Sequence, residues 1–309
     1  MHGYARFVMR GRLQAIVLIA MTAFVGLFFS PISYLAGASV ALVVLRLGVK
    51  EALIVVAGSA VGVALLGMLG SGDPAYGLMH MLMLSVPVMM IAQLLRQTTS
   101  LVLTFQVVAL LGIVIVLSMQ LFGQHWMEEW RVEFEKVIKQ TLEAANQQSG
   151  NGIKPADLKS VMELLGEKVS GIFGAVFVFS QLVMLTIARN WQARLYNPGG
   201  FTQEFHGLTL GKPVALVSLA VVLAGMMQGS AGELFSNMLG IIFVLYLVQF
   251  LAIAHVVIAR VTKGKQWLVA LYALVVIGLF VFPPLLMIMV LVGFADTWVN
   301  FRSHITKQA

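Results

Sequence analysis

Long apolar runs separated by short polar segments make up most of the chain. A helix needs about 20 apolar residues to cross about 30 Å of hydrocarbon. The alternating pattern of a transmembrane barrel is absent from the sequence, so helices are the remaining way to satisfy the backbone in lipid. The pattern predicts an all-α, polytopic transmembrane helical bundle of about 9–10 spans. The apolar runs cover residues 13–29, 32–45, 51–69, 75–95, 101–122, 170–188, 213–228, 234–259 and 267–295.

The last apolar run, 267–295, contains Pro283 and Pro284 in succession. A double proline removes two consecutive backbone donors, so an undisturbed helix cannot continue through it. The sequence leaves open whether this run is one long helix or two short ones.

Residues 124–169 have a different pattern. Apolar residues recur there at three- and four-residue spacing with charges between them, as in an amphipathic helix. A polar loop from Gln147 to Gly152 divides the insertion, and Pro155 begins a second helical pattern. We predict an amphipathic helical hairpin that lies on the membrane surface. Its eight acidic residues outnumber its six basic ones, so it is not a basic lipid-binding patch.

Composition agrees with an integral membrane protein. Hydrophobic residues make up 60% of the 309 residues, charged residues only 11%, and the mean hydropathy is +0.93. Soluble domains are about half apolar and about a quarter charged. The net charge of +7 comes from basic residues scattered over short loops, so we expect no nucleic-acid partner. The chain has no cysteine, which excludes disulfides, thiolate metal sites and Cys nucleophiles.

Basic residues are unevenly divided between the two sides of the predicted bundle. With the N-terminus inside and ten helices, fourteen of the twenty Lys and Arg residues lie on the cytoplasmic side. The other six lie in the 124–169 insertion. Because cytoplasmic loops carry an excess of Lys and Arg, we predict a multi-pass protein of the bacterial inner (cytoplasmic) membrane. Both termini are then cytoplasmic, the insertion is periplasmic, and the lipid bilayer is the principal partner.

Motifs of the common enzyme classes are absent. The sequence has no H-E-x-x-H, no G-x-S-x-G, and no phosphate-binding glycine loop followed by Lys and Ser or Thr. His80 and His255 have no second His or carboxylate at helical spacing, whereas a metal site needs three or four convergent ligands. We therefore expect no enzymatic activity, no cofactor and no metal site.

A few polar side chains fall inside or beside the predicted spans, and such groups are functional hypotheses by default. His80, Gln93 and Gln181 are the candidate lining of a solute-binding cavity, with Asp73 and Tyr76 at its outer mouth. The alternative interpretation is packing, because polar side chains commonly form hydrogen bonds between membrane helices.

Residues 191–212 form the longest polar stretch on the predicted cytoplasmic side. The sequence Asn-Pro-Gly-Gly fits a tight turn, because proline presets φ and glycine permits positive φ. We call this segment the elbow, and predict that its aromatic side chains lie at headgroup level. It is either a membrane-surface turn, a docking site for a cytoplasmic protein, or a substrate contact. The candidate partner-binding residues are Trp191, Tyr196, Asn197, Pro198, Gly199, Gly200, Phe201, Glu204 and Phe205.

Two motifs carry a family resemblance: YNPGGF at 196–201 with Glu204 and Phe205, and GFADTWVNFR at 293–302. With them, most of the chain resembles the YybS-like family of bacterial multi-pass membrane proteins, a domain-of-unknown-function group. That family is distantly similar to the S components of energy-coupling-factor transporters, small six-helix proteins that capture vitamins or metal ions. The resemblance implies an S-component-like six-helix membrane core in 1–190 and additional C-terminal membrane helices in 213–309.

Two functions remain open on these grounds. The first is binding or transport of a small solute by the six-helix core, which the resemblance implies. The alternative is a non-transporting membrane scaffold that docks partner proteins through the elbow and the 124–169 hairpin. Fold analogy by itself does not decide between them.

Overall fold

The computed structural model describes residues 2–70, 74–149, 155–261 and 266–304. This part of the chain contains thirteen α-helices, one short 3-10 helix and no strand. The all-α prediction is therefore confirmed for the described residues. The helices are α1 (His2–Val8), α2 (Arg12–Phe28), α3 (Ser30–Leu47), α4 (Val49–Gly70), α5 (Pro74–Thr98), α6 (Leu101–Phe122), α7 (Gln124–Ser149), α8 (Pro155–Tyr196), α9 (Gly200–His206), α10 (Lys212–Ala224), α11 (Ser230–Val261), α12 (Gln266–Phe280), α13 (Pro283–Val299) and η1 (Phe301–Ser303).

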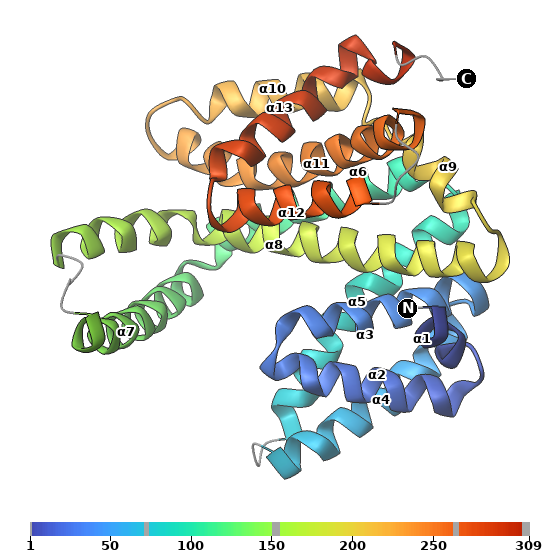
Figure 1. Cartoon of the computed structure of the whole chain (residues 1–309). Coiled ribbons are helices and arrows are strands. Elements are labelled where there is room, and N and C mark those ends of the chain that lie inside the picture. The colour runs from blue at the N-terminus through green and yellow to red at the C-terminus, as the bar shows by residue number, and fades with distance from the viewer. Residues whose placement is uncertain (1, 71–73, 150–154, 262–265, 305–309) are drawn as a thin grey trace.

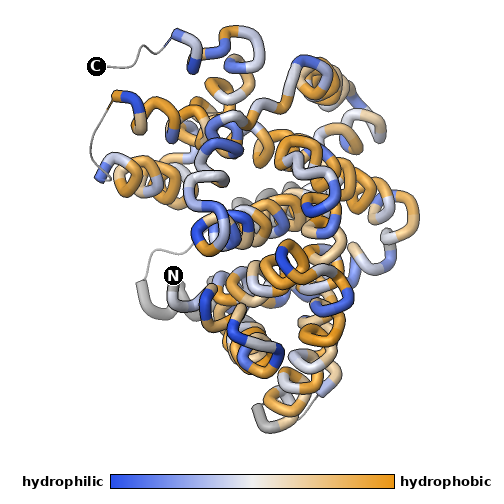
Figure 2. The backbone as a smooth tube through the Cα atoms, turned by 90° about the vertical axis from the view of Figure 1, so that its right-hand side faces the viewer, coloured by the Kyte–Doolittle hydropathy of each residue, from blue (hydrophilic) through white to orange (hydrophobic). Residues whose placement is uncertain are grey.

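Six of the described helices are long and apolar enough to cross a membrane: α3, α4, α5, α6, α8 and α11. Four shorter apolar helices, α2, α10, α12 and α13, bring the number of apolar helices in the described chain to ten. Figure 2 shows hydrophobic residues on the outer faces of the helices as well as between them. Phe28, Met226 and Phe280 are each 77% exposed. Soluble monomers rarely expose large continuous apolar surfaces, so these faces are suited to lipid.

The structure differs from the sequence prediction at α8. The hairpin helix was expected to end near residue 169 and a separate span to begin at 170, but α8 continues from Pro155 to Tyr196 without a break. No proline lies within it after its first residue, so no backbone donor is missing at the membrane edge. The helix α7 and the first part of α8 project from the bundle as a pair of helices (Figure 1), and that this pair lies on the membrane surface stays a prediction.

The base of this hairpin is fixed by aromatic contacts. The ring centroids of Trp126 and Trp130 in α7 lie 5.1 and 5.4 Å from that of Phe173 in α8. At the other end of the chain, the run that contains the double proline forms two helices, α12 and α13. The second begins at Pro283, where the missing donors have no helical partner to lose.

The long helix α8 lies between two groups of helices. Helices α2 to α5 form one group, and α6 and α10 to α13 form the other (Figure 1). Small residues allow α8 to approach both groups closely. A Cβ added at Gly37 of α3 would collide with the side chain of Met184, and one added at Gly171 of α8 would lie 2.5 Å from the carbonyl oxygen of Asn237 in α11. α8 is thus packed tightly on both sides.

Segments that were predicted to share the cytoplasmic face lie together at one end of the bundle. The guanidinium of Arg46 lies 4.1 Å from the ring centroid of Tyr196. Arg302 donates to the His206 carbonyl at 2.7 Å, and Arg260 donates to the Arg302 carbonyl at 2.6 Å. We call this end, formed by the turns after α3, α5 and α8 and by the C-terminal end of α11, the basic end. That it faces the cytoplasm stays a prediction from the charge bias.

Candidate functional site

Ser33 of α3 and His80 of α5 form a polar pair in the first helix group. The Ser33 hydroxyl oxygen lies 3.2 Å from His80 Nε2, and the tautomer of the imidazole decides which group donates. Ser33 is only 5% exposed and His80 is partly buried. Gly26 of α2 passes so close that a Cβ there would collide with the Ser33 hydroxyl. The pair therefore lies where α2, α3 and α5 meet.

Helices α3, α5 and α8 run in the same direction. One contact joins a residue of each helix and so shows which positions on the three helices lie at the same height. An ideal Cβ at Gly37 of α3 would meet the Met184 side chain of α8 and lie 3.4 Å from Leu84 Cδ1 of α5. Nearer the C-terminal ends of α3 and α5, Arg96 donates to the Val44 carbonyl at 3.2 Å. We therefore use Gly37, Leu84 and Met184 as markers, and count from them to find the heights of other residues on the same helices.

Ser33, His80 and Gln181 lie at nearly the same height. They precede the marker residues on their own helices by four, four and three residues, respectively. At about 1.5 Å of rise per residue, all three lie about 4.5–6 Å from the markers on the side away from the basic end. We call these three residues the polar layer.

The side chain of Gln181 has a buried oxygen that accepts no hydrogen bond from the described residues. Its side chain is 3% exposed, and its Oε1 atom has no hydrogen-bond partner among the described residues. Gln93 Oε1 is likewise buried without a partner, but Gln93 follows Leu84 by nine residues. Twelve residues of helical rise, about 18 Å, therefore separate the heights of the two glutamines. The structure brings His80 and Gln181 to one height and places Gln93 nearer the basic end.

The remaining candidates for the solute site lie near the start of α5. Tyr76 is 61% exposed, in the first turn of that helix. Asp73 lies outside the described residues. The described residues contain no group of three or more His, Asp or Glu side chains placed to hold a metal ion.

Two crevices with almost entirely apolar walls lie among other helices. One of about 260 Å³ lies between α6, α10 and α11, where Gln106 and Ser218 are the polar lining residues. Another of about 350 Å³ lies between α8, α11 and α12. Crevices with such walls offer few polar groups for recognising a polar solute.

The elbow is attached to α8 by an ion pair. Arg189 Nε donates to Glu204 Oε2 at 2.9 Å, and a second hydrogen bond joins Arg189 Nη2 to Glu204 Oε1. Between them the chain turns at Gly199, which has a φ of +89°, and the Gly200 amide donates to the Asn197 carbonyl at 3.0 Å. A bidentate pair of this kind fixes direction as well as distance, so α9 is held against α8.

The candidate partner-binding residues of the elbow fall into two sets. Trp191 and Phe205 are only 3% and 7% exposed, so the prediction that the elbow aromatics lie at headgroup level is wrong for these two. The Trp191 ring packs on Tyr4 of α1, with centroids 5.1 Å apart. Phe201 stacks on Phe205 at 5.5 Å and is partly buried. The exposed set is Tyr196, Asn197, Pro198 and Gly199, while Gly200 and Glu204 are partly buried.

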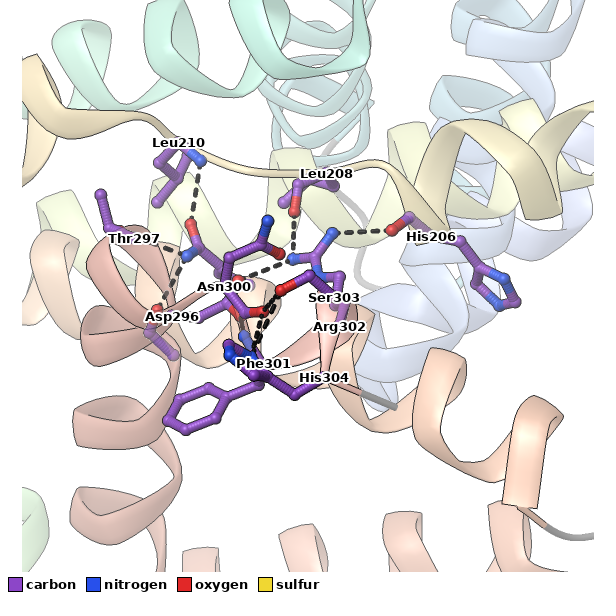
Figure 3. Close-up of polar contacts among 12 residues, drawn as sticks. His206, Leu208, Leu210, Asp296, Thr297, Asn300, Phe301, Arg302, Ser303 and His304 are labelled. Atoms are coloured by element: carbon purple, nitrogen blue, oxygen red, sulfur yellow. Dashed lines mark hydrogen bonds and ion pairs between the residues drawn. The ribbon is translucent and has the colours of Figure 1, made fainter. Parts of the chain in front are cut away.

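Sequence reasoning missed a polar network beside the elbow (Figure 3). Arg302 is 8% exposed and Asp296 is 2% exposed, and their side chains are joined at 3.2 Å. Arg302 also donates to the carbonyls of His206 at 2.7 Å and Leu208 at 2.6 Å. The signal was present in the motif at 293–302, which contains both charged residues. Only the folded chain shows that they reach back to the elbow.

These observations define a multi-spanning α-helical membrane protein with a polar layer on α3, α5 and α8 and an elbow that is held against α8 at its basic end. The family described as "Predicted membrane protein (DUF2232)" matches residues 14–297, and the chain belongs to this family. The resemblance to the YybS-like group is thereby confirmed. No curated protein and no solved structure matches the chain. The similarity to S components stays a prediction.

Proposed function

We propose that the first six membrane helices bind a small solute at the polar layer. The observation that supports this most directly is the buried Gln181 Oε1, which lies at the height of the Ser33–His80 pair and has no hydrogen-bond partner among the described residues. A buried acceptor without a hydrogen bond costs about 1–3 kcal/mol. A bound solute that donates a hydrogen bond to this atom would remove that cost.

The polar layer favours an uncharged solute. Ser33, His80 and Gln181 include no carboxylate, Lys or Arg, and burying a charge without an opposite one is unfavourable. The solute therefore offers at least one donor for Gln181 and a polar atom for His80. Release toward the other side would follow from tilting or rearrangement of the helices, as the resemblance to S components implies.

A thermal-shift screen of the purified protein tests this proposal. Vitamins, nucleobases and divalent metal ions are each added to the protein in detergent. We expect an uncharged, hydrogen-bonding compound to raise the melting temperature. The variant Gln181→Leu loses that shift, whereas Gln93→Leu keeps it, because Gln93 also has a buried unpartnered oxygen but lies at another height. A screen in which nothing moves the melting temperature, or equal effects of the two variants, would count against the proposal.

The scaffold function remains the second candidate, and the elbow supports it. Tyr196, Asn197, Pro198 and Gly199 are exposed on a turn that the Arg189–Glu204 pair holds in place. A rigid exposed turn binds a partner at a low cost in conformational entropy. Photo-cross-linking from position 197 in native membranes discriminates the two functions. A stoichiometric protein partner that is unrelated to transport ATPases favours the scaffold, and cross-links to lipid alone oppose it.

A further inference from the structure

A cavity of about 200 Å³ lies at the basic end, where α3, α5 and α8 meet. Its walls combine apolar side chains with two arginines and two further polar groups. None of these residues belongs to the polar layer, so the cavity is independent of the function proposed above. The lining residues are Leu45, Leu95, Arg96, Thr99, Arg189 and Gln192.

The polar groups of this cavity are held by the end of α3. Arg96 of α5 donates to the Val44 carbonyl at 3.2 Å, and Gln192 of α8 donates to the Leu45 carbonyl at 3.2 Å. Just beyond, Gly48 has a φ of +98°, and a Cβ at this position would collide with Arg96 Nη1. The glycine thus leaves the space that the guanidinium occupies.

The two arginines have more N–H donors than the described residues accept. A guanidinium carries five N–H groups, ten for the pair. Within the described part of the chain, four hydrogen bonds use them: one from Arg96 to Val44, two from Arg189 to Glu204, and one from Arg189 to Gln192. Six N–H groups therefore remain for other acceptors.

The charges around the cavity do not balance, and the excess is positive. Glu204 compensates Arg189, while Arg96 has no carboxylate partner among the described residues. Thr99, which also lines the cavity, has a φ of +51°, a conformation that is rare for a β-branched residue. Such backbone conformations gather at ligand-binding positions. The cavity therefore combines surplus donors, a net positive charge and a strained wall.

We propose that this cavity binds a phosphate group, either the phosphodiester of an anionic lipid headgroup or a free phosphate anion. Guanidinium groups match the oxygens of phosphate, and two of them on different helices can each donate to separate oxygens of one tetrahedral anion. The position at the end of the membrane helices is within reach of lipid headgroups. Anionic lipid is also concentrated at the cytoplasmic leaflet that the charge bias assigns to this end.

Two binding measurements on the full chain distinguish the sources. In the first, inorganic phosphate is titrated into delipidated protein at constant ionic strength, and the melting temperature is followed. In the second, native mass spectrometry counts phosphatidylglycerol and phosphatidylcholine molecules bound to the protein. Stabilisation by inorganic phosphate identifies a free-anion site. Selective retention of phosphatidylglycerol without a phosphate effect identifies a headgroup site. Absence of both effects overturns the proposal.

Variants locate the site. Arg96→Gln is expected to weaken the observed binding about tenfold or more, because a lost charge-assisted hydrogen bond is worth at least about 1.4 kcal/mol. Arg194→Gln is the matched control: Arg194 is an exposed arginine at the same end, as Arg96 is, but it donates to Asn190 at 3.0 Å and does not line the cavity. The affinity of the control variant should stay within about twofold of that of the parent protein. An equal loss in the two variants would show binding by general charge and refute the site.

A second pair of variants keeps the test valid if Arg96→Gln does not fold. Arg96→Lys retains the charge but removes the planar fork, and Gly48→Ala retains both arginines but displaces the guanidinium of Arg96. Both should weaken binding while the elution volume in size-exclusion chromatography stays unchanged. Full binding by both folded variants would contradict a role for the Arg96 guanidinium.

Discussion

Arg302 and Gln249 hold the two ends of one three-residue segment of the elbow. Arg302 Nη2 donates to the Leu208 carbonyl at 2.6 Å, and the Leu210 amide donates to Gln249 Oε1 at 2.9 Å. Leu208 and Leu210 are 0% and 2% exposed and lie between α9 and α10, outside the assigned helices. Buried backbone polar groups need partners. Side chains from η1 and α11 supply them, and so join the elbow to the C-terminal helices.

The substitution Gln249→Leu should destabilise the protein strongly. Gln249 also donates to the Gly293 carbonyl at 2.8 Å, so its loss leaves both that carbonyl and the Leu210 amide unpaired. Each buried unpaired group costs about 1–3 kcal/mol. The same change at Gln203, which is exposed on α9, is the control and should have little effect. Unfolding in mixed micelles measures both, and comparable stability of the two variants would disprove this assignment.

A double-mutant cycle on Arg302 and Asp296 should show strong coupling. Arg302→Met leaves the Asp296 carboxylate, which is 2% exposed, without its opposite charge. Breaking a buried ion pair in this way costs about 3–5 kcal/mol. Adding Asp296→Asn removes the stranded charge and retains an oxygen for the Phe301 amide, which donates to Asp296 Oδ1 at 2.9 Å. The double variant should therefore be more stable than Arg302→Met alone, and additive losses would exclude the coupling.

His206 should make stability depend on pH on the acidic side of neutrality. Burial lowers its pKa below the ordinary value, and the positive charges of His255, Arg302 and Arg260 lower it further. The unfolded chain, with a pKa of about 6.5, then binds a proton more readily than the folded protein. Stability is consequently complete above about pH 6.5 and falls as the pH drops from there toward the folded pKa.

Melting temperatures of the parent protein and His206→Gln between pH 8 and pH 5 check this expectation. Glutamine retains a polar side chain without a titrating group, and the His206 carbonyl that accepts from Arg302 remains in the backbone. The variant should lose part of the decline below about pH 6.5. Parallel curves for the two proteins would show that another group is responsible.

Much of the fold follows from patterns that each helix carries by itself. The apolar runs predict the membrane helices, and the three- to four-residue spacing around Trp126 and Trp130 predicts the hairpin. The continuity of α8 was missed because the change from amphipathic to apolar sequence near residue 169 marks the membrane edge, which is no barrier to a helix. The sequence identified Trp191 as an aromatic residue of the elbow, but the residue that covers it, Tyr4, is contributed by a helix far away in sequence.

The same distinction applies to the candidate site. His80 and Gln181 were identified because polar groups inside spans are rare, and that information is local. The pairing of His80 with Ser33, and the separation of Gln93 from Gln181, depend on how α3, α5 and α8 are aligned. The network of Arg302, Asp296 and Gln249 likewise depends on contacts between distant segments. Contacts between distant segments cannot be inferred from the local pattern of a single sequence.

The polar layer makes one further prediction, about the protein without solute. Gln181→Leu should raise the melting temperature of the solute-free protein, because it replaces a buried acceptor that has no partner with an apolar side chain of similar size. The gain expected is about 1 kcal/mol. A glutamine that is kept at the expense of stability is typical of a binding position, since function and stability often compete at such sites.

Glutamine-to-leucine exchange at Gln120, whose Nε2 donates to Ser170 at 3.3 Å, provides the contrast and should destabilise. If Gln181→Leu instead lowers the melting temperature as much as Gln120→Leu does, the Gln181 side chain is a packing element, and the solute site must be sought elsewhere.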